Sequence, residues 1–372
     1  MSIPFIDLNA QRKRLGGGME EAILKVARHG HYIMGPEVAE LETALATFCG
    51  ARHCISCSSG TDALALALMA WGIRPGDAVF VPAFTFVATA EVVAWLGATP
   101  VFVDVLEDSY NMDPASLEDA IGSASEMDLT PRAIIPVDLF GQPADYRSIL
   151  PIAANHNLKV LADAAQSFGA SLDGRYVGTF GDATSTSFFP AKPLGCYGDG
   201  GAVFTDDDEL AALLRSLRVH GKGSDKYDNV RIGMNGRMDT LQAAVVIEKL
   251  KIFPEEIEAR KRVAERYYRG LNNHVQVPRL IEGATSVWAQ YTVRTENRSA
   301  VQSACKSAGV PTAVYYPIPL SRQTGYQSFP TAPGGVPRSE RLAADVISLP
   351  MHPYLEESVQ DQIVQVVAST CA

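Results

Sequence analysis

The chain has 372 residues, of which 47% are apolar and 20% charged, and its formal net charge is −10. This length suggests two or three domains with a full core, and the composition excludes a disordered or collagen-like chain. The acidic balance provides no electrostatic footprint for nucleic acid or an anionic membrane, and six cysteines are too few for a disulfide scaffold.

No targeting or membrane segment is expected. The stretch Met1–Leu15 lacks the apolar run of a signal peptide. The apolar span 78–103 carries a single charge, but Pro82 and Pro100 interrupt it. Two buried strands joined by a helix explain this span better than a transmembrane helix does. We therefore expect a cytoplasmic protein.

Helical and strand patterns alternate along the first 250 residues. Apolar residues at helical spacing predict helices at Met19–Arg28 and Glu37–Phe48, and an apolar helix that the stretch 58–62 opens and that runs to about Trp71. Short apolar runs predict strands at His53–Cys57, Val79–Val81, Val101–Val103, Ala133–Val137, Val160–Ala162, Ser185–Phe189 and Ala202–Thr205. This alternation predicts an α/β fold whose mostly parallel central sheet has helices on both faces.

The pattern changes in the last third of the chain. Helices are predicted at Leu241–Leu250 and Glu255–Leu271, and then a strand–helix–strand pattern follows at Trp288–Val293, Ser299–Ala308 and Thr312–Tyr315. We predict a large α/β domain over residues 1–250. A linking helix and a smaller C-terminal α+β domain would then occupy residues 251–372.

A candidate anion site lies where the first strand meets the next helix. The residues Ser58-Ser59-Gly60-Thr61-Asp62 stand there, and amides at a helix N-terminus bind phosphate. The same residues also suit an ordinary helix cap, and no P-loop or dinucleotide fingerprint accompanies them. The nearby Cys54 and Cys57 have no second ligand pair at zinc spacing, so we expect no metal. A redox pair is the less favoured alternative to a plain buried strand.

Acidic residues follow two of the predicted strands. Asp163 comes directly after one apolar strand, and Asp138 comes after another. Ligands of open α/β sheets bind at the carboxyl ends of strands. An aspartate in this place is more often the cap of the next helix, so position alone leaves both interpretations open.

Lys192 gives the sharper signal. It follows a strand that carries two phenylalanines and a proline, and several glycines come after it. A lysine at the mouth of a sheet loses hydration, which lowers its pKa and makes the amine nucleophilic. A phosphate cradle, a strand-end aspartate and a late lysine, in this order, suit pyridoxal 5′-phosphate.

Taken together, these motifs resemble those of the DegT/DnrJ-type sugar-nucleotide aminotransferases, within the fold-type I class of pyridoxal-phosphate-dependent transferases. The resemblance covers nearly the whole chain. It rests on Gly35-Pro36-Glu37, Ser59-Gly60-Thr61-Asp62-Ala63-Leu64, Pro82-Ala83-Phe84-Thr85-Phe86, Asp163-Ala164-Ala165-Gln166, Ser187-Phe188-Phe189-Pro190-Ala191-Lys192 and Asn235-Gly236-Arg237-Met238-Asp239.

The resemblance implies roles for particular residues. Lys192 would bind the cofactor covalently and then move the proton, and Asp163 would pair with the ring nitrogen. Gln166 would reach the ring hydroxyl, and Phe86 would stack on the ring unless it is a plain core residue. The phosphate would be held by Gly60, Thr61 and Ser187, and by Asn235 of the neighbouring subunit. A homodimer with shared active sites follows, so a monomer would be inactive.

The resemblance also implies a substrate class. The dehydratase branch of the family carries histidine at the place of Lys192, so lysine favours amino transfer. The stretch from His220 to Arg237 resembles enzymes that aminate C3 of UDP-2-acetamido-2-deoxy-3-oxo-glucuronate for O-antigens and other surface polysaccharides, with L-glutamate as the usual donor. Arg237 suits a carboxylate bidentately, although an interface ion pair fits it equally well. Tyr315 and Tyr316 would line the sugar pocket or cap a strand.

Three alternatives remain. The first is an aminotransferase for a dTDP- or UDP-linked 3- or 4-keto-6-deoxy sugar without a carboxylate. The second is a cofactor-binding regulatory protein, which the complete set of Lys192, Asp163 and Gln166 disfavours. The third is a nicotinamide dehydrogenase, which the missing fingerprint disfavours.

Overall fold

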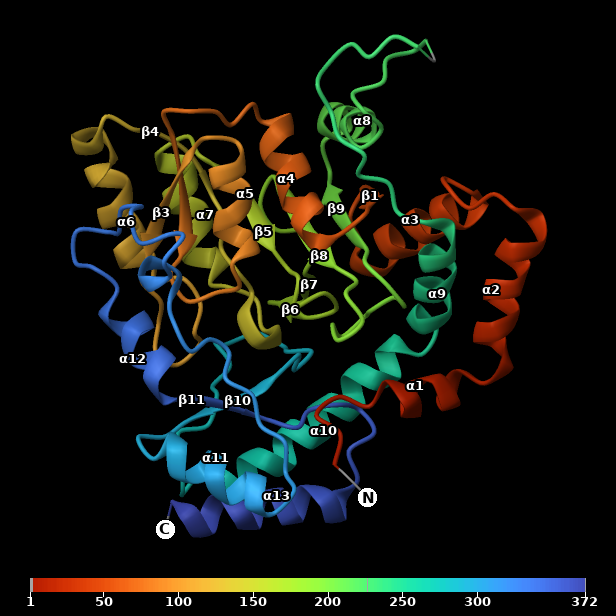
Figure 1. Cartoon of the computed structure of the whole chain (residues 1–372). Helices are drawn as coiled ribbons and strands as arrows, with labels where there is room; N and C mark the ends of the chain where they lie inside the picture. The colour runs from red at the N-terminus through yellow and green to blue at the C-terminus, as the bar shows by residue number, and fades with distance from the viewer. Residues whose placement is uncertain (1–2, 226, 372) are drawn as a thin grey trace.

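The computed structural model describes residues 3–225 and 227–371, so Lys226 in the expected substrate loop lies outside it. Its centre is a seven-stranded sheet in the order β1-β9-β8-β5-β4-β2-β3 (Figure 1). The strands are β1 (His53–Cys57), β2 (Asp77–Pro82), β3 (Thr99–Val103), β4 (Thr130–Ile134), β5 (Lys159–Asp163), β8 (Ala183–Ser187) and β9 (Gly201–Thr205). Only β9 runs antiparallel to its neighbours, so the expected mostly parallel α/β sheet is confirmed.

The strands carry apolar side chains on both faces, so helices pack against both faces of this sheet. In β2, Val79 and Val81 face one core cluster, whereas Ala78 and Phe80 face the other. One face is covered by α4 (Gly60–Ala70), α5 (Ala88–Trp95) and α8 (Asp208–Leu217). The other is covered by α3 (Pro36–Cys49), α6 (Pro114–Ser123), α7 (Tyr146–Asn155) and α9 (Thr240–Leu250). The remaining early elements are α1 (Leu8–Leu15), α2 (Gly17–His29), and the short strands β6 (Ser171–Leu172) and β7 (Arg175–Tyr176).

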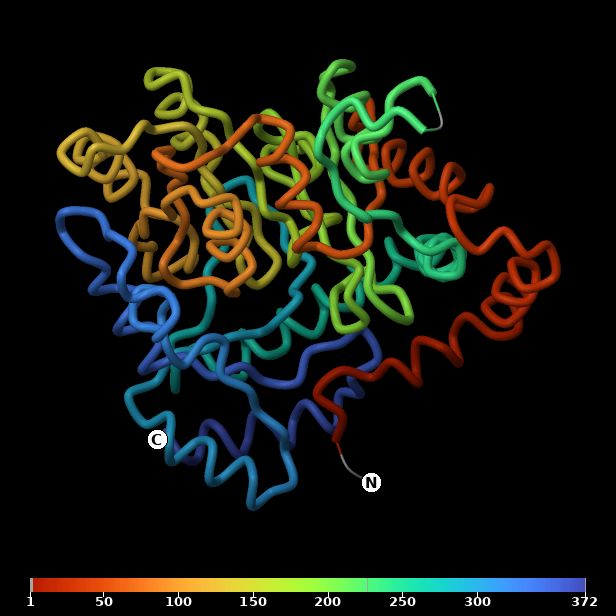
Figure 2. The backbone as a smooth tube through the Cα atoms, turned by 45° about the horizontal axis from the view of Figure 1, so that its top comes forward, coloured from red at the N-terminus to blue at the C-terminus, as the bar shows by residue number. Residues whose placement is uncertain are grey.

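A second, smaller core forms around an antiparallel pair of strands. The pair is β10 (Tyr291–Arg294) and β11 (Val346–Leu349), and it packs against α10 (Phe253–Leu271), α11 (Arg298–Ser307) and α13 (Glu357–Thr370) (Figures 1 and 2). Helix α10 begins in a core of the large sheet at Phe253 and ends in the smaller core. The chain before α12 (Pro337–Asp345) returns to the large sheet, where the Phe102 amide donates to the Pro330 carbonyl over 2.9 Å. The boundary between residues 250 and 251 stays a prediction.

Some element boundaries differ from the expected ones. The strand expected at Ala133–Val137 is β4, which ends at Ile134, because Pro136 has no amide to donate to a ladder. The expected strand Thr312–Tyr315 is wrong, since only Ala313 forms a single bridge there, to Ser348. Phe189 lies beyond β8 and is 50% exposed rather than part of a buried strand. The sequence analysis did not predict strand β11 at Val346–Leu349.

The described parts of the chain contain no helix that is long and apolar enough to cross a bilayer. Cys54 and Cys57 are buried in β1 with free thiols. Burial raises the pKa of both thiols, which disfavours a reactive thiolate and thus the redox alternative.

A mostly buried ion pair connects α3, β1 and the end of α8. Arg218 donates to the Ser56 carbonyl over 2.6 Å and pairs with Glu42, which accepts the Ser56 amide over 3.0 Å. Because truncation leaves the Glu42 charge buried, we expect Arg218→Ala to lower the free energy of unfolding by about 3–5 kcal/mol. Arg52→Ala removes a surface pair and should cost less than about 1 kcal/mol. Urea unfolding measures both; equal losses would contradict this prediction.

Candidate active site

Three loops meet at one edge of the large sheet. β1, β5 and β8 end at this edge, and their loops carry Ser58 to Gly60, the residues after Asp163, and Ser187 to Lys192. The first glycine of β9 lies at the same place, because a Cβ on Gly201 would stand 2.4 Å from the Ser59 carbonyl oxygen. The fold therefore brings the predicted residues Gly60, Ser187 and Asp163 together at the carboxyl ends of the strands, where α/β proteins bind ligands.

The N-terminus of α4 forms a cradle with free amide donors. Ser59 caps the helix, and its hydroxyl accepts the Asp62 amide over 3.0 Å. Within the described residues, the amides of Gly60 and Thr61 have no acceptor. A Cβ on Gly60 would stand 2.5 Å from the Ser187 Cβ, so only glycine allows this close approach. Two unpaired amides at a helix N-terminus suit a phosphate group.

A buried carboxylate faces the predicted lysine. Asp163 is 4% exposed, and it accepts hydrogen bonds from the Thr89 hydroxyl over 2.9 Å and the Ala165 amide over 3.2 Å. Burial raises the pKa of Asp163, against these hydrogen bonds and the charge of Lys192. Burial lowers the pKa of Lys192, and the Asp163 carboxylate partly offsets that effect. Among the described residues, no cation is hydrogen-bonded to the Asp163 carboxylate. Such a carboxylate, beside free phosphate donors, fits the protonated ring and the phosphate of pyridoxal phosphate.

An aromatic wall stands beside these residues. Gln166 accepts the Phe140 amide at 2.8 Å and donates to the Tyr316 hydroxyl at 3.3 Å. The ring of Tyr316 lies 6.2 Å from that of Phe86, which is 52% exposed and therefore open to a ligand. Tyr315 packs on Tyr316 at 5.8 Å. The structure thus gathers Gln166, Phe86 and both tyrosines, and a substrate role for the tyrosines stays a prediction.

The segment of Asn235 and Arg237 runs past the cradle. The carbonyl of Gly236, which lies between them, accepts the Ser58 amide over 3.1 Å. Asn235 is exposed, and Arg237 is partly buried with its Nε atom without a partner in the described residues. No hydrogen bond between described residues links either side chain to Lys192 or Asp163 of the same chain. Their roles toward a neighbouring subunit therefore stay predictions.

Two neighbours of Asp163 were missed by the sequence analysis. The Thr89 hydroxyl bonds to its carboxylate, and Asp138, noted only as a strand-end residue, lies beside it: the Asp138 amide donates to the Asp163 carbonyl over 3.0 Å. Thr89 lies in the first turn of α5, and no local pattern in the sequence indicated its contact with Asp163.

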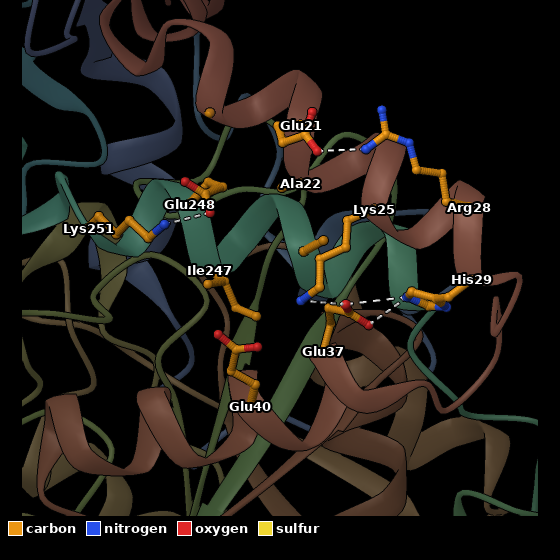
Figure 3. A pocket seen from close by; sticks show the side chains of 12 residues that line it. Glu21, Ala22, Lys25, Arg28, His29, Glu37, Glu40, Ile247, Glu248 and Lys251 are labelled. Carbon is orange, nitrogen blue, oxygen red and sulfur yellow. Dashed lines mark hydrogen bonds and ion pairs between the residues drawn. The ribbon is translucent and has the colours of Figure 1, made fainter.

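A hollow of about 710 Å³ lies elsewhere, between α2, α3 and α9 (Figure 3). Its charges largely neutralise one another, since Glu37 pairs with Lys25 at 3.2 Å and with His29 at 3.3 Å. Arg28 pairs with Glu21 and Lys251 with Glu248 in the same hollow. None of the predicted site residues lines it, so we do not assign the reaction to it.

Comparisons with known proteins agree with this geometry. The model of the DegT/DnrJ/EryC1/StrS aminotransferase family matches residues 15–368. The chain is 51% identical to UDP-2-acetamido-2-deoxy-3-oxo-D-glucuronate aminotransferase of Pseudomonas aeruginosa, over 95% of this chain and 96% of the relative. A DegT/DnrJ/EryC1/StrS aminotransferase structure from Brucella abortus has 53% identity and a TM-score of 0.98, with full coverage of both chains. NtdA of Bacillus subtilis, solved with bound cofactor PMP, has 30% identity and a TM-score of 0.90 over 100% of this chain and 85% of its own.

Proposed function

The chain belongs to the DegT/DnrJ/EryC1/StrS aminotransferase family and is therefore a pyridoxal-phosphate-dependent sugar aminotransferase, and we propose that it moves the amino group of L-glutamate to C3 of UDP-2-acetamido-2-deoxy-3-oxo-glucuronate. The 51% identity to a relative of that name supports this substrate. The product would serve O-antigen or another surface polysaccharide, and the reaction would take place in the cytoplasm.

The buried Asp163 carboxylate and the nearby, partly buried Lys192 carry the proposal for the chemistry. When bound, pyridoxal phosphate supplies an electron sink for the charge left on carbon after a proton departs. Gly60, Thr61 and Ser187 would hold the phosphate, and Gln166 and Phe86 would orient the ring. Asp163 would keep the ring nitrogen protonated. Lys192, whose pKa is lowered by burial, would take and return the proton, because a lower pKa favours the neutral amine that acts as a base.

Arg237 supports the choice of a uronate. Its guanidinium has an unpaired Nε in a partly buried place, and a planar fork of donors matches a carboxylate. We expect Arg237→Ala to raise the KM for the uronate sugar by about 10–100-fold, with Arg237→Lys recovering little. Steady-state kinetics with a UDP-3-keto sugar that lacks the carboxylate provide the control. An equal loss with both sugars would point to glutamate binding, and no loss with either would favour the keto sugars without a carboxylate.

The proposed homodimer has support on the surface. Tyr32, Ile33 and Met34 are 40–51% exposed, and Ile33 bridges to Asp239 beside the Asn235–Arg237 segment. The connection between α8 and α9 extends from the body (Figure 1) and exposes 89% of Ile232. Exposed apolar groups such as the consecutive Tyr32, Ile33 and Met34 are typical of interaction surfaces. We infer that a second copy covers them and receives Asn235 and Arg237 in its active site.

Subunit complementation tests this arrangement directly. Lys192→Ala and Arg237→Ala subunits are each impaired, but a mixed dimer with shared sites contains one site that carries both native residues. Random mixing after mild unfolding should therefore restore about a quarter of wild-type activity. If Arg237 serves the site of its own chain, every site in the mixture carries a defect and no activity returns.

A further inference from the structure

Asp138 is a buried acid that the proposed reaction does not use. Its side chain has no exposed surface, and its carboxylate accepts three hydrogen bonds. The donors are the Ala144 amide at 2.8 Å, the Tyr146 hydroxyl at 2.7 Å and the Ser167 hydroxyl at 2.7 Å. Burial of an acid is costly unless its oxygens are satisfied, so this acid needs a structural or functional reason.

Two contacts of Asp138, one from its side chain and one from its backbone, restrain the loop that follows β5. Ser167 ends the run from Asp163 through Gln166, and its hydroxyl is bound to Asp138. At the start of the same run, the Asp138 amide donates to the Asp163 carbonyl over 3.0 Å. Two residues after Asp138, the Phe140 amide fixes the Gln166 side chain at 2.8 Å. The segment after β4 therefore contacts the loop at its first residue, Asp163, at its last residue, Ser167, and at the side chain of Gln166.

The charges around Asp138 show that packing alone does not account for it. Tyr146 on α7 and Asp163 at the end of β5 are the titratable groups that face it, and Lys192 lies beyond Asp163. Burial raises the pKa of Asp138 to about 7, and the Asp163 carboxylate acts in the same direction, against the three hydrogen bonds. An apolar residue would avoid this cost, but it could not hold the Ser167 hydroxyl.

We propose that Asp138 is a positioning residue, which through Ser167 holds Asp163 and Gln166 in the places where they meet the cofactor ring. The inference rests on the cofactor roles proposed for these two residues, and not on the identity of the sugar. On this proposal the hydrogen bond between Asp138 and Ser167 increases the affinity for the cofactor, although neither side chain would contact the cofactor.

The chain offers a matched control for this contact. Ser339 also donates a buried hydroxyl over 2.7 Å to a buried aspartate, Asp104, after the edge strand β3. Both serines have no exposed surface. Ser167→Ala and Ser339→Ala therefore delete the same kind of bond in two places, of which only the first lies beside the site. A stability loss common to both cannot be mistaken for a positioning effect.

The test measures the dissociation constant of pyridoxal phosphate with cofactor-free protein, by quenching of intrinsic fluorescence. We expect Ser167→Ala and Asp138→Ala to weaken binding by about tenfold, and Ser339→Ala to leave it unchanged. Asp138→Asn should recover most of the affinity, because its amide can accept from Ala144 and Tyr146 and donate to the Ser167 oxygen. Thermal unfolding of the cofactor-free proteins verifies that each variant folds.

Two results would overturn the inference: native affinity in Ser167→Ala, or an equal loss in Ser339→Ala. Asp163→Asn, measured beside them, separates this failure from a failure of the site. If Asp163→Asn loses affinity while Ser167→Ala does not, only the positioning role is wrong. If Asp163→Asn also binds normally, the assignment of the ring contact is wrong.

Discussion

Lys192→Ala is expected to lower kcat for amino transfer by about 10⁴-fold, because it removes the group that takes and returns the proton. Burial lowers the pKa of this amine, and the nearby Asp163 carboxylate offsets part of the effect. A lowered pKa increases the share of the neutral amine, the form that acts as a base. Lys192→Arg should not recover activity, because a guanidinium stays protonated at any working pH.

Steady-state kinetics with L-glutamate and a UDP-3-keto sugar measure this loss. Lys159→Ala is the control, since that lysine lies on the surface, paired with Asp182, and should retain full activity. The absorption spectrum of the variant with added pyridoxal phosphate reports whether the cradle still binds the cofactor. A Lys192→Ala enzyme with more than a few per cent of native kcat would show that another group moves the proton.

Asp163→Asn is expected to lower kcat on the order of 10²–10³-fold, the usual cost of losing one placed electrostatic contact. The amide has nearly the shape of the carboxylate and can still accept the Thr89 hydroxyl, but it carries no charge to keep the ring nitrogen protonated. Single-turnover measurements of the glutamate half-reaction isolate this effect from sugar binding. Asp163→Glu, which keeps the charge on a longer arm, should recover only part of the rate.

Stability should respond differently to the same change. Because burial raises the pKa of Asp163 above its usual value, the ionised acid is less favourable in the folded chain than in the unfolded chain at neutral pH. The neutral amide removes this cost, so the cofactor-free Asp163→Asn protein should not unfold at a lower temperature than the native one. A large drop in the unfolding midpoint would mean that the activity loss reflects misfolding.

The sequence alone determined the type of fold and the chemical components of the site. Alternating strand and helix patterns predicted the parallel sheet, since a strand buried on both faces needs a continuous apolar run. The order of Gly60, Asp163 and Lys192 predicted the cofactor, because each residue type has its own chemical role. Glycine lets the backbone approach the phosphate closely, aspartate supplies a negative charge, and lysine supplies a nucleophile. Local signals of this kind need no knowledge of distant contacts.

Only the tertiary structure decided which residues meet. Gln166 reaches Tyr316 across 150 positions of the chain, and Asp163 at the end of β5 accepts a hydrogen bond from the Thr89 hydroxyl in helix α5. The antiparallel direction of β9 and the anchoring of the Asp163–Ser167 loop by Asp138 also depend on strand order. Such contacts follow from how strand ends line up at one edge of a sheet. That alignment arises from long-range pairing and burial, which local patterns in a sequence do not record.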